Sequence, residues 1–204
     1  MILDWAVGIS ATVLGRFDEA VNYMDTAAKL DPLSPAIVTS VGYLAFLARR
    51  MDDALAAQQL ALDLDPYFAT AVTNAARCHL HKGDTALAVE MFEKGRRMAG
   101  DIPTLMGAQA QAYAMNGDHT AARALIETLR QMANEKFVPC TAFALAHIGL
   151  GEVDCALNWL ELGCDRHELS ISGMAVHPAY DSIRTGPRFE ALLRRMGLYR
   201  TITT

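Results

Sequence analysis

The sequence has few of the features that identify an enzyme or a membrane protein. It contains no glycine-rich phosphate loop, no nucleophile elbow and no pair of carboxylates in a setting that would separate their pKa values. The run without a charged residue at residues 33–48, which no other such run exceeds in length, is interrupted by Pro35 and is too short to cross a bilayer. We therefore expect a protein that is not an enzyme, has no cofactor and does not enter the membrane.

An excess of basic charge and paired cysteines are also lacking. Lys and Arg number 18 against 23 Asp and Glu, so the formal net charge is −5 and direct nucleic-acid binding is not expected. The four cysteines are scattered without paired spacing, and no basic leader precedes the first apolar residues. This pattern favours a reducing compartment, and we expect a cytoplasmic protein.

What the sequence does contain is a repeat of 34 residues. One column of the repeat is always alanine, a second marks a turn, and a third lies one helical turn after the alanine on the same face. The columns are Ala20, Ala54, Ala88, Ala122 and Ala156; Gly15, Arg49, Gly83, Gly117 and Gly151; and Met24, Gln58, Phe92, Ile126 and Leu160.

The columns predict two packed helices in each unit, joined by a turn. Glycine at the turn tolerates a positive φ, and Arg49 is the one departure among the five units. Small residues such as Gly42 and Ala54 are expected to face each other, because a larger side chain would push the two helices apart. Asp84 and Asp118 follow two of the turns, and Asp84 is expected to cap the helix that begins there.

This pattern resembles the tetratricopeptide repeat family, whose units are 34-residue helix–turn–helix pairs. The resemblance covers residues 1–162 and implies an all-α fold: a right-handed superhelical solenoid of about five units with a C-terminal capping helix. We expect units at about 1–33, 34–67, 68–101, 102–135 and 136–163, and a capping segment at 164–204. The first two units match best, through Gly8, Ala20, Ala27 and Pro32, then Gly42, Ala54, Ala61 and Pro66.

After residue 162 the 34-residue period stops, and a last amphipathic helix is predicted from about Pro187 to Met196. Residues 177–198 are similar to the terminal segment of tetratricopeptide regions in bacterial regulators, which carry an N-terminal winged-helix or adenylate or guanylate cyclase domain. This resemblance implies a C-terminal sensory or regulatory region with an effector domain in the same polypeptide; a free-standing protein is the alternative. The matching residues are Pro178, Tyr180, Asp181, Arg184, Pro187, Arg188, Phe189, Leu192, Leu193, Met196, Gly197 and Leu198, whereas Gly186 departs.

The resemblance to the repeat family also places a binding surface. In that family the concave wall is lined by fixed positions of the first helix of each unit, and these positions form the expected partner-binding groove here. Only Arg77 among them carries a full charge, so a groove for acidic chaperone tails is not expected. The predicted groove residues are Trp5, Ile9, Thr12, Thr39, Tyr43, Phe46, Leu47, Thr73, Arg77, Leu80, His81, Gln111 and Met115.

An apolar and aromatic groove suits an amphipathic helix or an apolar strand of a partner, anchored by Trp5, Tyr43 and Phe46. The alternative is that these rings pack between neighbouring helices. Two uses of the surface stay open at this point: capture of a protein or peptide partner, and self-association into a homodimeric scaffold.

Two weaker features complete the sequence. Cys164 and His167 are three residues apart, but no second pair completes a zinc site, and we expect no metal. Five arginines between residues 184 and 200 are offset by Asp181 and Glu190, so a solvated helix face is expected rather than a phosphate-binding patch.

Overall fold

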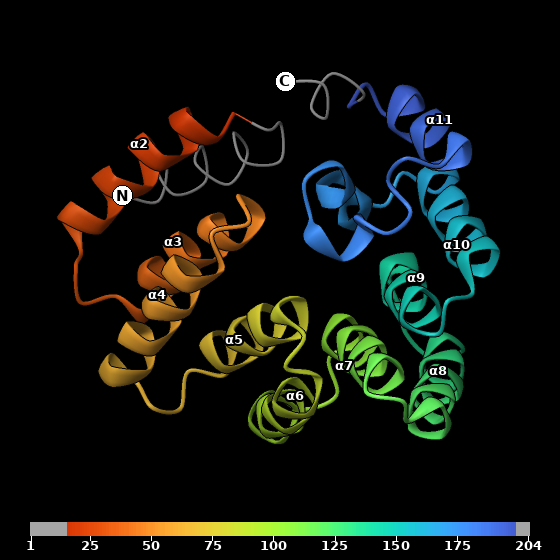
Figure 1. Cartoon of the computed structure of the whole chain (residues 1–204), viewed down its shortest axis with the longest axis horizontal. Helices are drawn as coiled ribbons and strands as arrows, with labels where there is room; N and C mark the ends of the chain where they lie inside the picture. Colours follow the sequence, from red (N-terminus) through yellow and green to blue (C-terminus); the bar gives the residue numbers. More distant parts are fainter. Residues whose placement is uncertain (1–15, 199–204) are drawn as a thin grey trace.

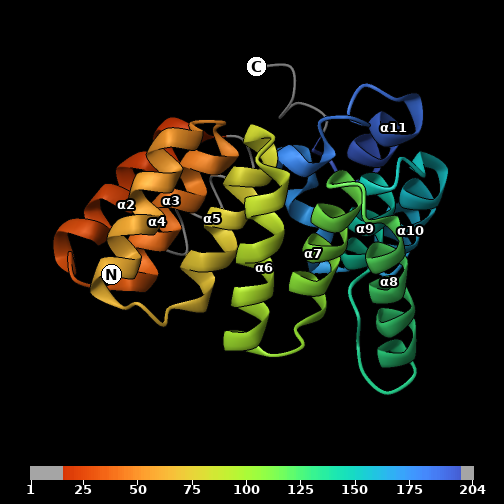
Figure 2. The same ribbon diagram turned by 60° about the horizontal axis from the view of Figure 1, so that its bottom comes forward.

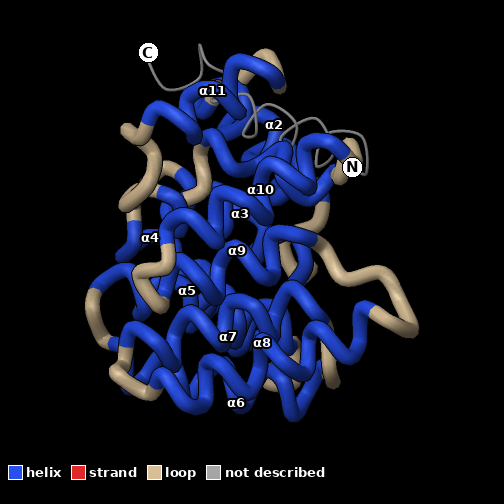
Figure 3. Tube along the Cα trace, turned by 90° about the vertical axis from the view of Figure 1, so that its right-hand side faces the viewer, coloured by secondary structure: helices blue, strands red, loops and turns tan. Residues whose placement is uncertain are grey.

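The computed structural model describes residues 16–198, and within this range the chain is helical without a strand (Figure 3). Two short 3₁₀ helices, η1 and η2, separate the last two α-helices. The elements are α2 (Phe17–Leu30), α3 (Pro35–Leu47), α4 (Met51–Leu64), α5 (Ala69–Lys82), α6 (Thr85–Ala99), α7 (Pro103–Met115), α8 (His119–Ala133), α9 (Cys140–Gly149), α10 (Val153–Asp165), η1 (Leu169–Ala175), η2 (Pro178–Tyr180) and α11 (Pro187–Arg195).

The helices form hairpins that follow one another around an open ring (Figure 1). Helices α3, α5, α7 and α9 line its inner side, and each packs against the next helix of the chain, α4, α6, α8 or α10, on the outer side. Figure 2 shows the same hairpins standing side by side. The all-α solenoid predicted from the 34-residue period is confirmed.

The turn inside each hairpin keeps one geometry through four units. Gly83, Gly117 and Gly151 have φ values of 90°, 87° and 73°, and Arg49 adopts the same left-handed region at 62°. In each turn the following amide donates to a carbonyl five residues earlier, for example Arg50 N to Ala45 O at 2.8 Å. The repeat register therefore imposes the turn even where glycine is absent, and the side chain of Arg49 must supply the compensation.

The caps agree with the sequence only in part. The Asp118 carboxylate accepts a hydrogen bond from the Ala121 amide at 2.9 Å and caps α8 as such residues do. The cap predicted for Asp84 is wrong, because its carboxylate instead contacts His79 Nδ1 at 3.1 Å and makes no cap bond to α6.

Close packing within a hairpin rests on small residues, as predicted. A Cβ atom added to Gly42 would overlap the Gln58 side chain and lie 2.9 Å from Ala57 Cβ and 3.1 Å from Ala54 O. Gln58, the polar departure in its column, is buried at 1% exposure, and its amide donates to Thr39 O at 3.2 Å. The polar side chain is thus accommodated because it ties α4 to the inner helix α3.

The C-terminal end has two parts with different positions. Helix α11 packs against α10 through Phe189, Leu192 and Leu193, all at most 2% exposed, and forms the predicted capping helix. The preceding segment, residues 168–186, turns into the interior of the ring instead of covering its end (Figure 1). The concave face is therefore partly filled by the protein's own chain.

Candidate ligand-binding site

A cavity of about 440 Å³ lies between the inner helices and this returning segment. We call it the inner cavity. Helices α3, α5, α7 and α9 supply one side of its lining, and residues from η1 and η2 supply the other. The lining residues are Thr39, Ser40, Tyr43, Thr70, Asn74, Arg77, Thr104, Thr141, Leu145, Ser170, Gly173, Met174, His177 and Tyr180.

The segment that closes the cavity is fastened to α9 at its start. The buried carboxylate of Glu168 accepts hydrogen bonds from the Cys140 backbone amide at 2.8 Å and from Cys140 Sγ at 3.0 Å. Cys140 is the first residue of α9, so a negative charge meets the positive end of the helix dipole. Burial, and then the Glu168 carboxylate, raise the pKa of the Cys140 thiol to about 12, which keeps it protonated and able to donate.

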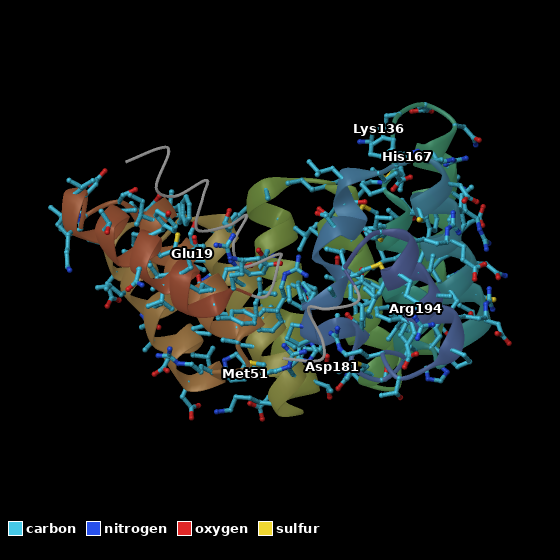
Figure 4. The ribbon with its side chains drawn as sticks, turned by 90° about the horizontal axis from the view of Figure 1, so that it is seen from above. Glu19, Met51, Lys136, His167, Asp181 and Arg194 are labelled. Atoms are coloured by element: carbon cyan, nitrogen blue, oxygen red, sulfur yellow. The ribbon has the colours of Figure 1, made fainter. Side chains whose placement is uncertain are left out.

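The other end of the segment is fastened to the turn between α3 and α4. Arg49 donates to Leu47 O at 2.7 Å, to Val176 O at 2.9 Å and to Asp181 Oδ1 at 2.6 Å. In Figure 4, Asp181 and Met51, the first residue of α4, lie at the same edge of the molecule. These bonds explain why an arginine occupies the glycine position of this turn, because its side chain joins the repeat array to the returning segment.

Arg184 holds the segment in its folded form. Its guanidinium donates to Asp181 Oδ1 at 2.7 Å, to His177 O at 2.9 Å and also to the Ala175 carbonyl. Asp181 thus sits between two arginines, one from the repeat array and one from the segment itself. The two arginines thus donate to the carbonyls of Ala175, Val176 and His177, which lie at the ends of the short 3₁₀ helices.

An aromatic cluster packs beside the cavity. The His177 ring meets the edge of Phe46 with centroids 5.3 Å apart and lies 5.8 Å from Tyr180. Burial, followed by the cation of Arg77, lowers the pKa of His177 well below its usual value, so the ring is neutral near pH 7. Its Nδ1 accepts a hydrogen bond from the Ala179 amide at 3.1 Å, which assigns the proton of the neutral ring to Nε2.

Arg77 gives the inner cavity its electrostatic character. It is the one charged side chain in the lining, and within residues 16–198 no carboxylate or carbonyl accepts a hydrogen bond from it. Its guanidinium lies over the Phe92 ring, whose centroid is 6.0 Å from the Arg77 Cζ atom. Burial lowers the pKa of the guanidinium, yet arginine stays cationic in proteins, so the cavity holds an unpaired positive charge.

The structure places the predicted groove residues in four groups: partly exposed, exposed, outside the described residues, and buried. Tyr43, Arg77 and His81 are partly exposed, and Tyr43 and Arg77 line the inner cavity together with the buried Thr39. Met115 is 46% exposed at the end of α7. Trp5, Ile9 and Thr12 lie outside the described residues. Six predicted groove residues are buried, namely Thr39, Phe46, Leu47, Thr73, Leu80 and Gln111.

The buried positions have a common physical cause. Inner helices are covered on both flanks by neighbouring helices, and the returning segment adds a third contact, as the rings of Phe46 and His177 show. Sequence reasoning missed His177, Tyr180 and Met174 because it placed the whole C-terminal region at the end of the stack. The one signal in the sequence was Arg49, an arginine in the glycine column of the repeat, whose side chain reaches Val176 and Asp181 of this segment.

One group of side chains outside the cavity has metal-ligand character. Candidate ligand atoms of His147, Glu152 and Cys155 all lie within 4.8 Å of one another. Both carboxylate oxygens of Glu152 are already engaged, one by His147 Nδ1 and one by Arg123, each at 2.6 Å. The Glu152 carboxylate is therefore satisfied by hydrogen bonds and ion pairing as it stands.

The C-terminal arginines are engaged in the same way. Arg188 bonds Glu161 at 2.9 Å and Asp154 at 3.0 Å, and Arg195 bonds Asp165 at 2.6 Å. These pairs fasten α11 to α10, as expected for a helix face rather than for a phosphate-binding patch; Arg200 lies outside the described residues.

Comparison with known proteins fits the fold. The family model "Tetratricopeptide repeat" matches residues 8–67 and 73–135, more than half of the chain. This chain belongs to the tetratricopeptide repeat family. Repeats of this kind stack into concave surfaces that serve as protein-interaction modules, and proteins built from them are typically non-catalytic.

Relatives and solved structures resemble this tetratricopeptide repeat chain over different lengths. The Hsp70-Hsp90 organizing protein of Triticum aestivum is 31% identical over 90 residues, which span 44% of this chain and only 16% of the wheat protein. A chain of the crystal structure of the APC/C hetero-tetramer Cut9-Hcn1 matches with a TM-score of 0.66 and 15% identity, covering 99% of this chain and 42% of that one.

A smaller solved protein shares the architecture. The crystal structure of MamA protein matches with a TM-score of 0.53 and 18% identity, over 82% of this chain and 91% of the other. At these identities the likeness concerns the fold alone. Among residues 16–198, no helix is both long and apolar enough to cross a membrane.

Proposed function

We propose that this chain is a non-catalytic module that captures a protein or peptide partner on its concave face. The observation that supports this best is the inner wall of α3 and α5, where Tyr43, Arg77 and His81 keep part of their surface exposed and the first two line the inner cavity. Aromatic rings and arginine are the side chains that dominate binding energy at protein interfaces. An extended or helical segment with an apolar anchor suits this wall.

Peptide selection from a displayed library against the purified chain tests this proposal directly. The selected peptides are then measured by isothermal titration calorimetry. We expect Tyr43→Ala to weaken their binding by more than about 1 kcal/mol, the size of an interface hot spot. Leu87→Ala is the matched control, because Leu87 is 41% exposed on the outer helix α6. Equal losses in both variants, or no selected peptide at all, would contradict the proposal.

The biological setting we propose is the C-terminal regulatory region of a bacterial signalling or transcription-regulatory protein in the cytoplasm. Support comes from the segment at residues 177–198, whose matching residues Asp181 and Arg184 hold the returning segment in place. An immunoblot of source cells tests this setting. A band far above 22.2 kDa is expected if an effector domain is attached. A band at 22.2 kDa would contradict this setting.

A second use, self-association, is favoured by a row of exposed apolar side chains. They lie in the loops that join one hairpin to the next, and Figure 2 shows the loops after α4, α6 and α8 along one edge. Light scattering over a concentration series tests self-association. The apparent molecular mass is expected to rise with protein concentration, and Tyr67→Ser is expected to reduce that rise. The row comprises Leu33, Tyr67, Ile102 and Phe137, which are 73%, 84%, 43% and 68% exposed.

A further inference from the structure

The inner cavity holds polar groups that the fold itself does not use. Thr39 is only 3% exposed, and its hydroxyl has no hydrogen-bond partner in the described part of the chain. Tyr180 is 4% exposed, and neither its hydroxyl nor that of Tyr43 donates to any described residue. An enclosed polar group without a partner costs free energy, and Thr39 supplies one such group in the lining, beside the two tyrosine hydroxyls that donate to no described residue. Together these groups point to a ligand that can accept hydrogen bonds.

The charges around the cavity define the ligand's sign. Arg77 is the one charged group in the lining, and no Asp or Glu lies in that set. His177 is neutral because burial lowers its pKa, and burial raises the pKa of both tyrosines, so they remain donors. The cavity therefore presents one positive charge and several hydrogen-bond donors, which together complement a single negative charge.

The size and remaining lining define the ligand's class. A volume of about 440 Å³ falls in the range of small-molecule sites, and Leu145 and Met174 add apolar surface to the lining. A carboxylate with one charge matches a single arginine, whereas a phosphate with nearly two charges would call for further cations. We propose that the inner cavity binds a small organic monocarboxylic acid, whose carboxylate pairs with Arg77 and whose apolar part contacts Leu145 and Met174.

This site adds a small-molecule ligand to the chain and does not depend on a protein partner. The cavity joins residues of the repeat array to residues of the returning segment, so a bound acid bridges the two. Binding is thus expected to stabilise residues 168–186 against local opening, as well as to raise the melting temperature.

The test uses the full chain and a panel of simple acids. Butyrate, octanoate, benzoate and phenylacetate are titrated by calorimetry, with octanol, benzyl alcohol and inorganic phosphate as comparisons. At least one acid is expected to bind, while the alcohols and phosphate do not. Arg77→Met is expected to raise the dissociation constant of that acid by about ten- to hundredfold, the range for loss of a charged hydrogen bond. Arg97→Met is the matched control, because Arg97 lies on the outer face of α6 with its side chain 69% exposed.

Stability of the ligand-free variants separates a binding role from a structural one. Because Arg77 has no carboxylate partner among the described residues, Arg77→Met is expected to leave the melting temperature of the free protein unchanged or higher. A lower melting temperature together with unchanged acid binding would overturn the proposal, as would a panel in which no acid binds or in which phosphate alone binds.

A final arm separates this proposal from partner capture. A peptide that ends in a free carboxylate is compared with the same peptide ending in an amide. Binding of the free-ended peptide alone, with all free acids inactive, would overturn the small-molecule site and support partner binding. Binding of an acid by a chain that captures no peptide would support the small-molecule site and contradict partner binding.

Discussion

The two halves of the solenoid differ in how closely their inner helices approach each other. Helices α7 and α9 are in backbone contact: a Cβ atom on Gly149 would lie 2.7 Å from Gln111 O, and one on Gly107 would overlap the Ala142 backbone. Helices α3 and α5 contact each other much less, and they supply most of the lining that the inner cavity takes from the repeat helices. The same repeat thus builds a closed wall in one half and an open one in the other.

Residue volume at equivalent repeat positions accounts for this difference. Two units before Gly107 stands Thr39, and two units before Gly149 stands His81, whose ring meets Phe46 at 5.3 Å. A side chain at either position holds the inner helices apart, whereas glycine lets them touch. Placement of glycine, more than the repeat period, decides where a solenoid of this kind opens a binding surface.

The open half is expected to depend most on Phe46. This ring is 1% exposed and contacts Tyr43, His81 and His177, so it joins α3, α5 and the returning segment. We expect Phe46→Ala to lower the free energy of unfolding by about 4 kcal/mol, measured by urea unfolding with circular dichroism. Phe137→Ala is the control, since Phe137 is 68% exposed and its loss should change stability by less than about 0.5 kcal/mol. Similar values for the two variants would mean that Phe46 is not part of the core.

The closed half is expected to lose stability when its inner helices are forced apart. Gly107→Val places a branched side chain against the Ala142 backbone, and we expect a loss of about 3 kcal/mol in the same unfolding experiment. Gly173→Ala is the matched control, because no atom lies within 4 Å of the added Cβ and the backbone there is not in the left-handed region. A stable Gly107→Val protein would show that α7 and α9 need not touch.

Sequence periodicity predicted the repeat fold well because its causes are local. The turn column and the small residues at Gly42 and Ala54 both follow from spacing within one unit. The Asp84 cap failed because a side chain from the preceding helix, His79, competes for the same carboxylate. Spacing identifies where a polar side chain lies but not which of its neighbours it bonds.

The candidate site was only half accessible to sequence reasoning. Repeat positions indicated Thr39, Tyr43 and Arg77, which line the inner cavity. The other side of the cavity comes from residues more than 120 positions away in sequence from Arg49, the arginine that anchors them. No period relates these segments, and the one sequence clue was an arginine in a glycine column.

The link between the open half and the returning segment is expected to break in Arg49→Gly. Glycine suits the positive φ of this turn, so the repeat array should keep its stability, but the bonds to Val176 and Asp181 are lost. We expect amide hydrogen exchange in residues 176–186 to accelerate by about tenfold, the equivalent of one charged hydrogen bond. Faster exchange throughout the chain, instead of in this segment, would mean that Arg49 serves the turn alone.

The smallest expected effect concerns two turns at equivalent positions, one in each half. His147 and Glu152 contact at 2.6 Å and are 7% and 27% exposed in their side chains, whereas His79 and Asp84 contact at 3.1 Å and are 20% and 53% exposed. Exposed pairs contribute little because water screens them. We expect Glu152→Gln to reduce stability by roughly 0.5 to 1 kcal/mol at neutral pH, and Asp84→Asn to reduce it by less.

The pH dependence of the Glu152 effect has a definite sign. The hydrogen bond from His147, followed by that from Arg123, lowers the pKa of Glu152 in the folded chain. Its stabilising contribution is therefore complete above the unfolded pKa of about 4.3 and is lost as the pH falls through the lower folded pKa. The gap between the wild type and Glu152→Gln should narrow below about pH 4 in urea unfolding measured at several pH values. A difference in stability that stays constant at acid pH would show that Glu152 contributes through packing. The His147–Glu152 pair would then make no electrostatic contribution to the stability of the closed half.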